Sequence, residues 1–206
     1  MSPGRQHRCW LAHSSLASPS AWCLRFLPAV LASVLLWSEA ARSQQQVGPG
    51  LVTTPITGNQ NVTVVGSTQL MPNPGTVAVS PSGSAFVTFN PALVQPGPIS
   101  VQTQDAPAIV ITGGTDIAIN PDAAPYLTTI TTTGTNAFAI NVVSGNHTEL
   151  LNNVAISTTG AGADAIKIDN PNNIINATDV RVTTTGAGAS ALALLSGGRD
   201  GGKFYE

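Results

Sequence analysis

The acidic and basic side chains that could act on a substrate gather towards the C-terminal end of the sequence. Asp164, Asp169 and Asp179 lie close to Lys167 and Arg181 along the chain. Two carboxylates held as a fixed pair hydrolyse glycosidic bonds, and a lyase needs a calcium-binding cluster of carboxylates beside a basic residue. Either chemistry requires the fold to bring these side chains together, so the elements that carry them decide the question.

His147 stands apart from these residues, in the loop Gly145-Asn-His-Thr-Glu149. A histidine can act as a base or bind a metal ion. No cysteine, second histidine or pair of acids lies near it in the sequence to complete such a site. Gly160-Ala-Gly162 is glycine-rich like a phosphate loop, but no helical pattern follows it. We therefore expect no catalytic, cofactor-binding or metal-binding residue, and no cofactor.

The elements around these residues repeat. Three segments share a Thr-rich strand pattern that ends in glycine, and these glycines, Gly134, Gly160 and Gly186, are equally spaced. The match continues after each glycine, as Ala137-Phe-Ala-Ile-Asn-Val142, Ala163-Asp-Ala-Ile-Lys-Ile168 and Ala189-Ser-Ala-Leu-Ala-Leu194. A fixed period of about 26 residues is typical of a solenoid, in which each repeat forms one coil.

Each repeat alternates apolar and polar residues, which predicts strands. Two strands flank a glycine corner, and Leu150-Leu151 and Ile174-Ile175 indicate a third strand. The expected fold is therefore all-β, a parallel β-helix with coils of about 26 residues. Stacking should align apolar residues in interior rows and threonines in columns that hydrogen-bond along the solenoid. The expected rows are Ile130, Ile156 and Val182, and Ile140, Ile166 and Leu192; the expected columns are Thr132, Thr158 and Thr184, and Thr133, Thr159 and Thr185.

Stacked repeats argue against a catalytic cluster. The position of Asp164 is Phe138 in the preceding repeat and Ser190 in the following one. Because no column of acids forms, we expect these charges to be solvated on corners, where Asp and Lys usually lie. The chain is therefore predicted not to be an enzyme. The alternative is a fragment of a polysaccharide-degrading β-helix enzyme whose acid cluster lies in downstream sequence.

Residues 1–43 are predicted to be a secretory signal peptide. Basic residues precede an apolar run, residues 26–37, and small residues follow it. The run is too short for a helix across a bilayer of about 30 Å; an uncleaved membrane anchor is the alternative. Both cysteines, Cys9 and Cys23, lie here, so the exported chain would contain no disulfide. It would keep four basic and nine acidic residues, a net charge of −5, which argues against a nucleic-acid partner.

The chain after the leader divides by pattern. Residues 44–98 contain short alternating runs between prolines and glycines, and are predicted to form an N-terminal cap and irregular first coils. Within them, residues 77–89 are interpreted as a degenerate copy of the later strand, corner, strand unit. Disorder is the alternative for the first part, because aromatics make up only 5% and Gly and Pro number 20 and 15. Residues 99–195 are the β-helix repeats, and residues 196–206 break the pattern, which indicates a truncated chain.

The long basic leader, the cysteine-free Thr/Asn/Gly/Ala-rich chain and the Ile-x-Thr-Thr-Gly-Ala-Gly-Ala coils resemble the passenger region of Gram-negative autotransporters, the pertactin-like adhesins. The resemblance covers the leader and residues 99–194. Such proteins carry a C-terminal β-barrel translocator, and no run of amphipathic strands follows residue 194 here. The resemblance identifies architecture more closely than activity.

The resemblance implies an N-terminal passenger fragment that is exported through the periplasm to the outer-membrane surface or secreted. Its implied role is adhesion, a non-catalytic binding of molecules on host or neighbouring cells. Contact with the outer membrane itself would require the translocator barrel. A structural surface or matrix repeat protein without a specific ligand is a further alternative.

Overall fold

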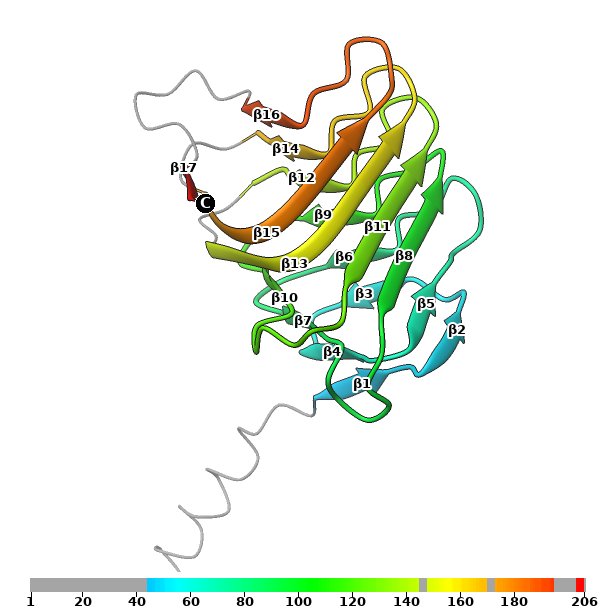
Figure 1. Ribbon diagram of the computed structural model, residues 1–206, viewed down its shortest axis with the longest axis vertical. Coiled ribbons are helices and arrows are strands. Elements are labelled where there is room, and N and C mark those ends of the chain that lie inside the picture. Colours follow the sequence, from blue (N-terminus) through cyan, green and yellow to red (C-terminus); the bar gives the residue numbers. More distant parts are fainter. Residues whose placement is uncertain (1–43, 145–147, 170–172, 195–202, 206) are drawn as a thin grey trace, which may run out of the picture. The chain divides into compact units, whose positions relative to one another are not determined.

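The computed structural model describes residues 44–144, 148–169, 173–194 and 203–205. The predicted signal peptide, His147 and most of the pattern-breaking tail lie outside these ranges. Within them, every secondary-structure element is a β-strand, and every pair of neighbouring strands is parallel. The predicted all-β parallel β-solenoid is confirmed (Figure 1).

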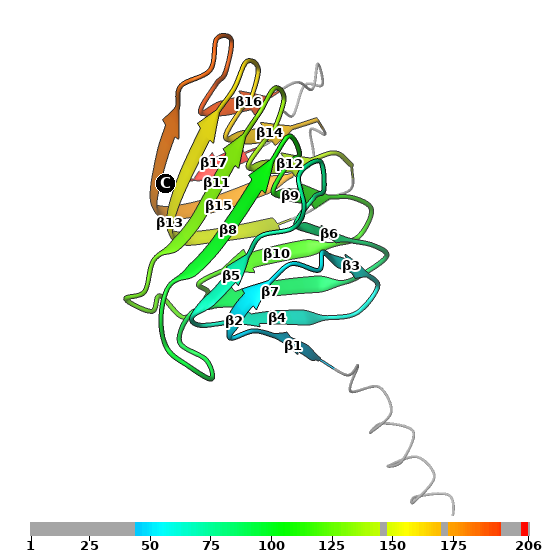
Figure 2. The same ribbon diagram turned by 90° about the vertical axis from the view of Figure 1, so that its right-hand side faces the viewer.

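Three strands make one turn, and each strand pairs with the equivalent strand of the neighbouring turns, so the solenoid has a first, a second and a third face (Figure 2). The first face starts with β1 (Gln45–Val47), β4 (Val62–Val65), β7 (Phe86–Asn90) and β10 (Asp116–Ile119). The second starts with β2 (Gly50–Val52), β5 (Thr68–Leu70), β8 (Ile99–Gln104) and β11 (Thr128–Thr133). The third contains β3 (Ile56–Gly58), β6 (Val79–Pro81), β9 (Ile109–Ile111), β12 (Ile140–Val142), β14 (Ile166–Ile168) and β16 (Leu192–Leu194).

Two long strands, β13 (Thr148–Thr159) and β15 (Ile174–Thr184), each span the first and second faces. The start of β13 pairs with β10 and its end with β11. The bend between the two halves falls at Asn153 and Asp179, whose φ angles are 50° and 52°. Asn and Asp enter this left-handed region more readily than other non-glycine residues. The predicted third strand is therefore the first half of a continuous bent strand, and β17 (Lys203–Tyr205) pairs with the same half of β15.

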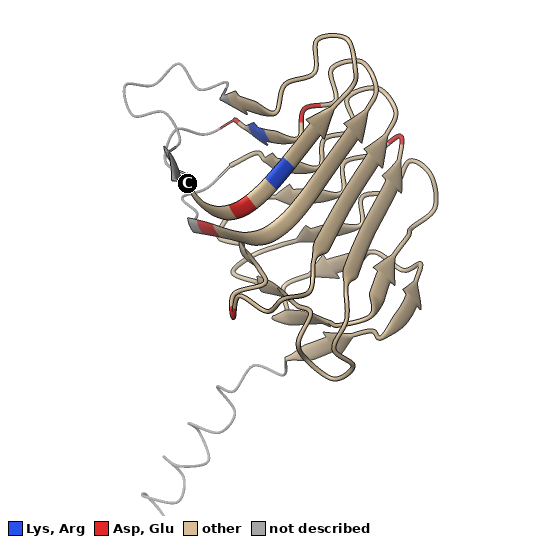
Figure 3. Cartoon of the chain, in the orientation of Figure 1, with Lys and Arg blue, Asp and Glu red and all other residues tan. Residues whose placement is uncertain are grey.

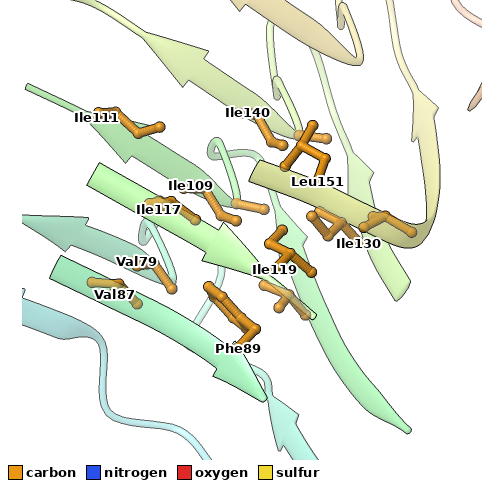
Figure 4. Close-up of a cluster of buried hydrophobic side chains, with 14 of the residues drawn as sticks. Val79, Val87, Phe89, Ile109, Ile111, Ile117, Ile119, Ile130, Ile140 and Leu151 are labelled. Carbon is orange, nitrogen blue, oxygen red and sulfur yellow. The ribbon is translucent and has the colours of Figure 1, made fainter. Parts of the chain in front are cut away.

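Three of the interior rows, one on each face, are apolar from the first turn to the last. The predicted rows through Ile130, Ile156 and Val182 and through Ile140, Ile166 and Leu192 are confirmed in register. Figure 4 shows side chains of these rows packed together inside the coils. The full rows are Val47, Val64, Phe89, Ile119, Leu151 and Ala177; Val52, Leu70, Val101, Ile130, Ile156 and Val182; and Ile56, Val79, Ile109, Ile140, Ile166 and Leu192.

The early turns differ from the sequence interpretation. Residues 44–58, for which disorder was the alternative, form β1, β2 and β3, which pair with the next turn. The interpretation of residues 77–89 as a copy of the later strand, corner, strand unit is wrong. In that later unit a second-face strand precedes a third-face strand, whereas β6 lies on the third face and β7 on the first. Loops of different length separate the faces in these turns and conceal the period.

Buried threonines form hydrogen bonds across the corners between the second and third faces. The hydroxyls of Thr103 and Thr158 donate hydrogen bonds to the carbonyl oxygens of Ala106 and Ala163, at 2.8 and 2.6 Å. Thr132 makes the equivalent bond to Ala137. Thr132 and Thr158 do stack in register. Their hydroxyls bond across the corner of their own coil, however, so the prediction that this column hydrogen-bonds along the solenoid is wrong.

We predict that Thr158→Val lowers the free energy of unfolding by about 1–3 kcal/mol. The substitution keeps the shape of the side chain but removes the donor to a buried carbonyl, which then loses its partner. Urea denaturation followed by circular dichroism measures the effect. The control is Thr159→Val, because Thr159 is exposed on the outside of the same strand. Equal effects of the two substitutions would contradict the corner-closing role.

Candidate binding surface

The charged residues singled out in the sequence occupy separate places in the solenoid. Lys167, on the outside of the third face, lies 3.0 Å from a carboxylate oxygen of Asp169 and 4.9 Å from the ring centroid of Phe138. The two side chains of this ion pair are 19% and 27% exposed. An ion pair and a cation–π contact of this kind stabilise a surface only slightly. The charges of Lys167 and Asp169 are therefore paired with each other.

Asp164 is buried at 9% exposure, so the expectation that it is solvated is wrong. Its Oδ1 accepts a hydrogen bond of 2.7 Å from the backbone N–H of Ser190 in the next coil. Asn59 and Asn61 act in the same way in an early turn, where their Oδ1 atoms accept the N–H groups of Ser84 and Phe86. These side chains supply a partner to backbone groups at places where the ladder between coils is interrupted.

The remaining two candidates, Asp179 and Arg181, lie on the long strand β15. Asp179 forms its exposed bend, and Arg181 is exposed on the outside of the second face. In the parts of the chain that are described, no group of three or more His, Cys, Asp or Glu side chains could hold a metal ion. The structure thus pairs Lys167 with Asp169 and uses Asp164 and Asp179 in the backbone architecture.

Sequence reasoning did not single out Glu149, an acidic residue whose pKa the structure shifts strongly. Its side chain is 1% exposed and takes an inward position in the first face, in register with Ile175. Oε2 accepts the backbone N–H of Ile117 at 2.7 Å, while Oε1 has no hydrogen-bond partner. Burial raises the pKa of Glu149 to about 8, the charge of Asp116 adds to this, and the hydrogen bond from Ile117 opposes it. At 1% exposure, no substrate reaches this carboxyl while the coil is closed.

On β8, β11, β13 and β15, the outside of the second face is a largely neutral array, mainly of hydroxyl and amide groups, which we call the polar face. Neighbouring strands lie about 4.8 Å apart and alternate residues about 7 Å apart along each strand, so the side chains form a flat grid. Arg181, at one end, is the single charged residue of this set. The polar face consists of Ser100, Gln102, Gln104, Thr129, Thr131, Thr133, Ala155, Ser157, Thr159, Arg181 and Thr183.

A groove borders the polar face on the side of the early turns. It has a volume of about 280 Å³. One wall is formed by Met71, Pro72 and Pro74, and the other by side chains of the polar face, including Gln102 and Thr131. Apolar side chains against neutral polar ones are typical of sites that hold uncharged ligands. Sequence alternation in the Thr-rich strands could have predicted this array, because it places every second threonine outside.

The fold and this surface define the chain as a parallel β-solenoid with one broad neutral face. No protein-family model, curated protein or solved structure matches it. The described residues also contain no helix of the length and apolarity that membrane crossing requires.

Proposed function

We propose that this chain is an exported, non-catalytic binding protein, the passenger fragment of an autotransporter-like adhesin that attaches to molecules on host or neighbouring cells. The observation that supports the proposal is the polar face, which extends over β8, β11, β13 and β15 in register. A regular flat array of this kind can contact a long ligand at several coils at once. Many weak contacts then add to a useful affinity.

The chemistry of the polar face favours an uncharged ligand. Hydroxyl and amide groups both donate and accept hydrogen bonds, so they match neutral hydroxyl- or amide-bearing polymers. Charged ligands would have to exchange their hydration for contacts with neutral groups, which is unfavourable. Neutral glycan chains and extended neutral peptides at a cell surface fit these requirements.

Export is the second part of the proposal. It is supported by the apolar run and small residues of the leader, and by the absence of cysteine after residue 43. A chain without cysteine can pass an oxidising compartment without forming disulfides. We accordingly propose a secreted or cell-surface location in a Gram-negative bacterium.

Arginine on the polar face is expected to weaken binding to whole cells by about tenfold, which corresponds to a loss of about 1.4 kcal/mol. The variant carries Thr133→Arg and Thr159→Arg, both at exposed positions in neighbouring strands. It introduces long charged side chains into the neutral grid. Flow cytometry with labelled protein measures the binding to host cells and to bacteria.

The control places two arginines on the outside of the third face instead, as Ser80→Arg and Ala193→Arg, where binding should be unchanged. Circular dichroism verifies that both variants remain folded. Equal loss in both variants would show that the polar face is not the binding surface. A wild-type chain that binds no cell type at any concentration would overturn the adhesin proposal.

A further inference from the structure

The groove beside the polar face opens where β5 ends and β8 continues. β5 ends at Leu70, whereas β8 runs on to Gln104. Two prolines, Pro72 and Pro74, follow the end of β5, and proline has no N–H group to donate to a neighbouring strand. β5 therefore cannot continue alongside β8, and the proline segment forms one wall of the groove instead.

This wall is fixed at both ends by the backbone. The N–H of Met71 donates a hydrogen bond of 2.9 Å to the carbonyl oxygen of Val52 in the preceding turn. The N–H of Gly75 donates one of 2.8 Å to the carbonyl oxygen of Gln104. Pro72, between these two anchors, is buried. A wall held in this way needs little ordering when a ligand binds, so less of the binding free energy is lost.

The groove has no charge with which to hold an ion. None of the described residues that line it is charged. No Lys, Arg, Asp or Glu occurs between residue 44 and Asp105, and Figure 3 shows β5, β8 and β11 without charged residues. Such a lining offers no cation to pair with the carboxylate, sulfate or phosphate of an acidic sugar. Asp105, exposed directly after Gln104, would repel these groups. The groove therefore suits a neutral ligand.

The two walls offer this ligand different contacts. Met71 is 38% exposed, and its flexible side chain and Pro74 can cover a small apolar group. On the other wall, Gln102 and Gln104 carry carboxamides, which both donate and accept hydrogen bonds. The Nε2 of Gln102 donates to Oγ of Ser100 at 3.1 Å, which holds that side chain in place. An acetamido group matches both walls, because it has a methyl group for the first and an N–H and a carbonyl for the second.

The backbone around the groove argues against a peptide ligand. An extended peptide commonly binds by adding a strand to an open sheet edge. β8 pairs with β11 on one side and, at Ser100 and Val101, with β5 on the other. Beyond Val101, residues 71–75 cover that second side. A ligand must therefore be recognised by side chains, and the volume of about 280 Å³, just below the ~300–1,000 Å³ of typical small-molecule sites, suits one compact group.

We propose that the groove binds the acetamido group of a neutral N-acetylated sugar. The methyl group lies against Met71 and Pro74, and the amide forms hydrogen bonds with the carboxamide of Gln104. Hydroxyls of the same sugar bond to Thr131 and Thr133, which line the groove and also belong to the polar face. This role rests on the proposed function, since the rest of the glycan would lie along the polar face.

Two matched sugar tetramers test the groove by isothermal titration calorimetry with the full chain. One consists of β-1,4-linked N-acetylglucosamine and the other of β-1,4-linked glucose, so that they differ only at the acetamido position. The acetylated tetramer should bind about tenfold more tightly. Equal affinities, or no binding of either tetramer, would overturn the proposal. A neutral peptide of Ser, Thr and Gln that binds more tightly than the acetylated tetramer would assign the groove to peptides and overturn it as well.

Met71→Gln is expected to remove the preference, so that the two tetramers bind with nearly equal affinity, because a polar amide replaces the apolar contact for the methyl group. Leu93→Gln is the control. Leu93 is similarly exposed, at 41%, but is absent from the residues that line the groove. If both variants keep the preference of the wild type, Met71 does not contact the acetamido group and the assignment fails.

Flow cytometry of the wild type separates this proposal from the adhesin proposal. A chain that binds cells but does not distinguish the tetramers would refute the groove assignment and leave the adhesin proposal standing. A chain that prefers the acetylated tetramer but binds no cells would support the groove assignment and refute the adhesin proposal.

Discussion

Replacing Gly160 by alanine is expected to be among the most damaging single substitutions in this protein, with a loss of about 3–5 kcal/mol of unfolding free energy. Gly160 has a φ of 147°, and a Cβ atom at this position would lie 2.1 Å from the carbonyl oxygen of Gly134 in the preceding coil. Forced backbone shifts in a packed structure cost about 1–3 kcal/mol, and an unfavourable φ costs a similar amount. Urea denaturation of the variant and the wild type measures the difference.

Gly188→Ala is the matched control, because Gly188 has a positive φ of 71° but open space around a Cβ atom. This variant measures the effect of the positive φ alone, and it should lower the free energy of unfolding by about 1 kcal/mol. If the two variants lose equal stability, the close approach of the stacked corners is not what selects glycine. Gly186 repeats the contact one coil further on, with a Cβ position 1.6 Å from the oxygen of Gly160. The glycine column is thus a requirement of coil spacing.

Glu149→Gln is expected to stabilise the protein by about 3 kcal/mol at pH 7 and to remove most of its pH dependence. Burial raises the pKa of Glu149 to about 8, against 4.5 for an ordinary glutamate. Between these two values the folded chain binds a proton that the unfolded chain has lost, so stability falls as pH rises. Each pH unit in this window costs about 1.4 kcal/mol. Below pH 4.5 both states are protonated and the penalty disappears.

Glutamine keeps the acceptor for the Ile117 N–H and cannot ionise. Unfolding free energies measured from pH 4.5 to 8 should therefore slope downwards for the wild type and stay nearly level for the variant. Asp179→Asn is the control, because Asp179 is exposed at the bend of β15 and Asn153 holds the equivalent bend of β13. It should leave the slope unchanged. A wild-type stability that is constant over this range would contradict the buried, protonated state of Glu149.

The later coils were predictable because their length is constant. The partners Ile140, Ile166 and Leu192 are equally spaced along the chain, so alternation and spacing alone give the register. In the early turns, the interval from Gly50 to its partner Thr68 is much shorter than the interval from Val79 to its partner Ile109. The coils stack equally well there, because the extra residues lie in loops between faces. A search for a fixed period cannot detect turns whose lengths differ by this much.

The burial of the acidic side chains was harder to predict from the sequence, since Asp and Glu are usually solvated. Asp164 is buried because its carboxylate replaces a missing backbone acceptor for Ser190, a role that depends on the neighbouring coil. Glu149 had a signal in the sequence that was not used. It precedes Ile175, its inward-facing partner in the next coil, by the same interval that separates Gly134 from Gly160. Extending the period to residue 149 would have predicted its burial.

The coils contain different numbers of residues but are stacked at the same spacing, and this has a mechanical consequence. Each coil adds only about 4.8 Å to the length of the solenoid, but it stores a full turn of chain. A coil of about 26 residues pulled out to an extended chain would release about 90 Å. Tension applied along the chain would thus be relieved in long discrete steps, the longest from the middle turns. The protein would act as an extensible tether, lengthening many-fold before the covalent chain bears the load.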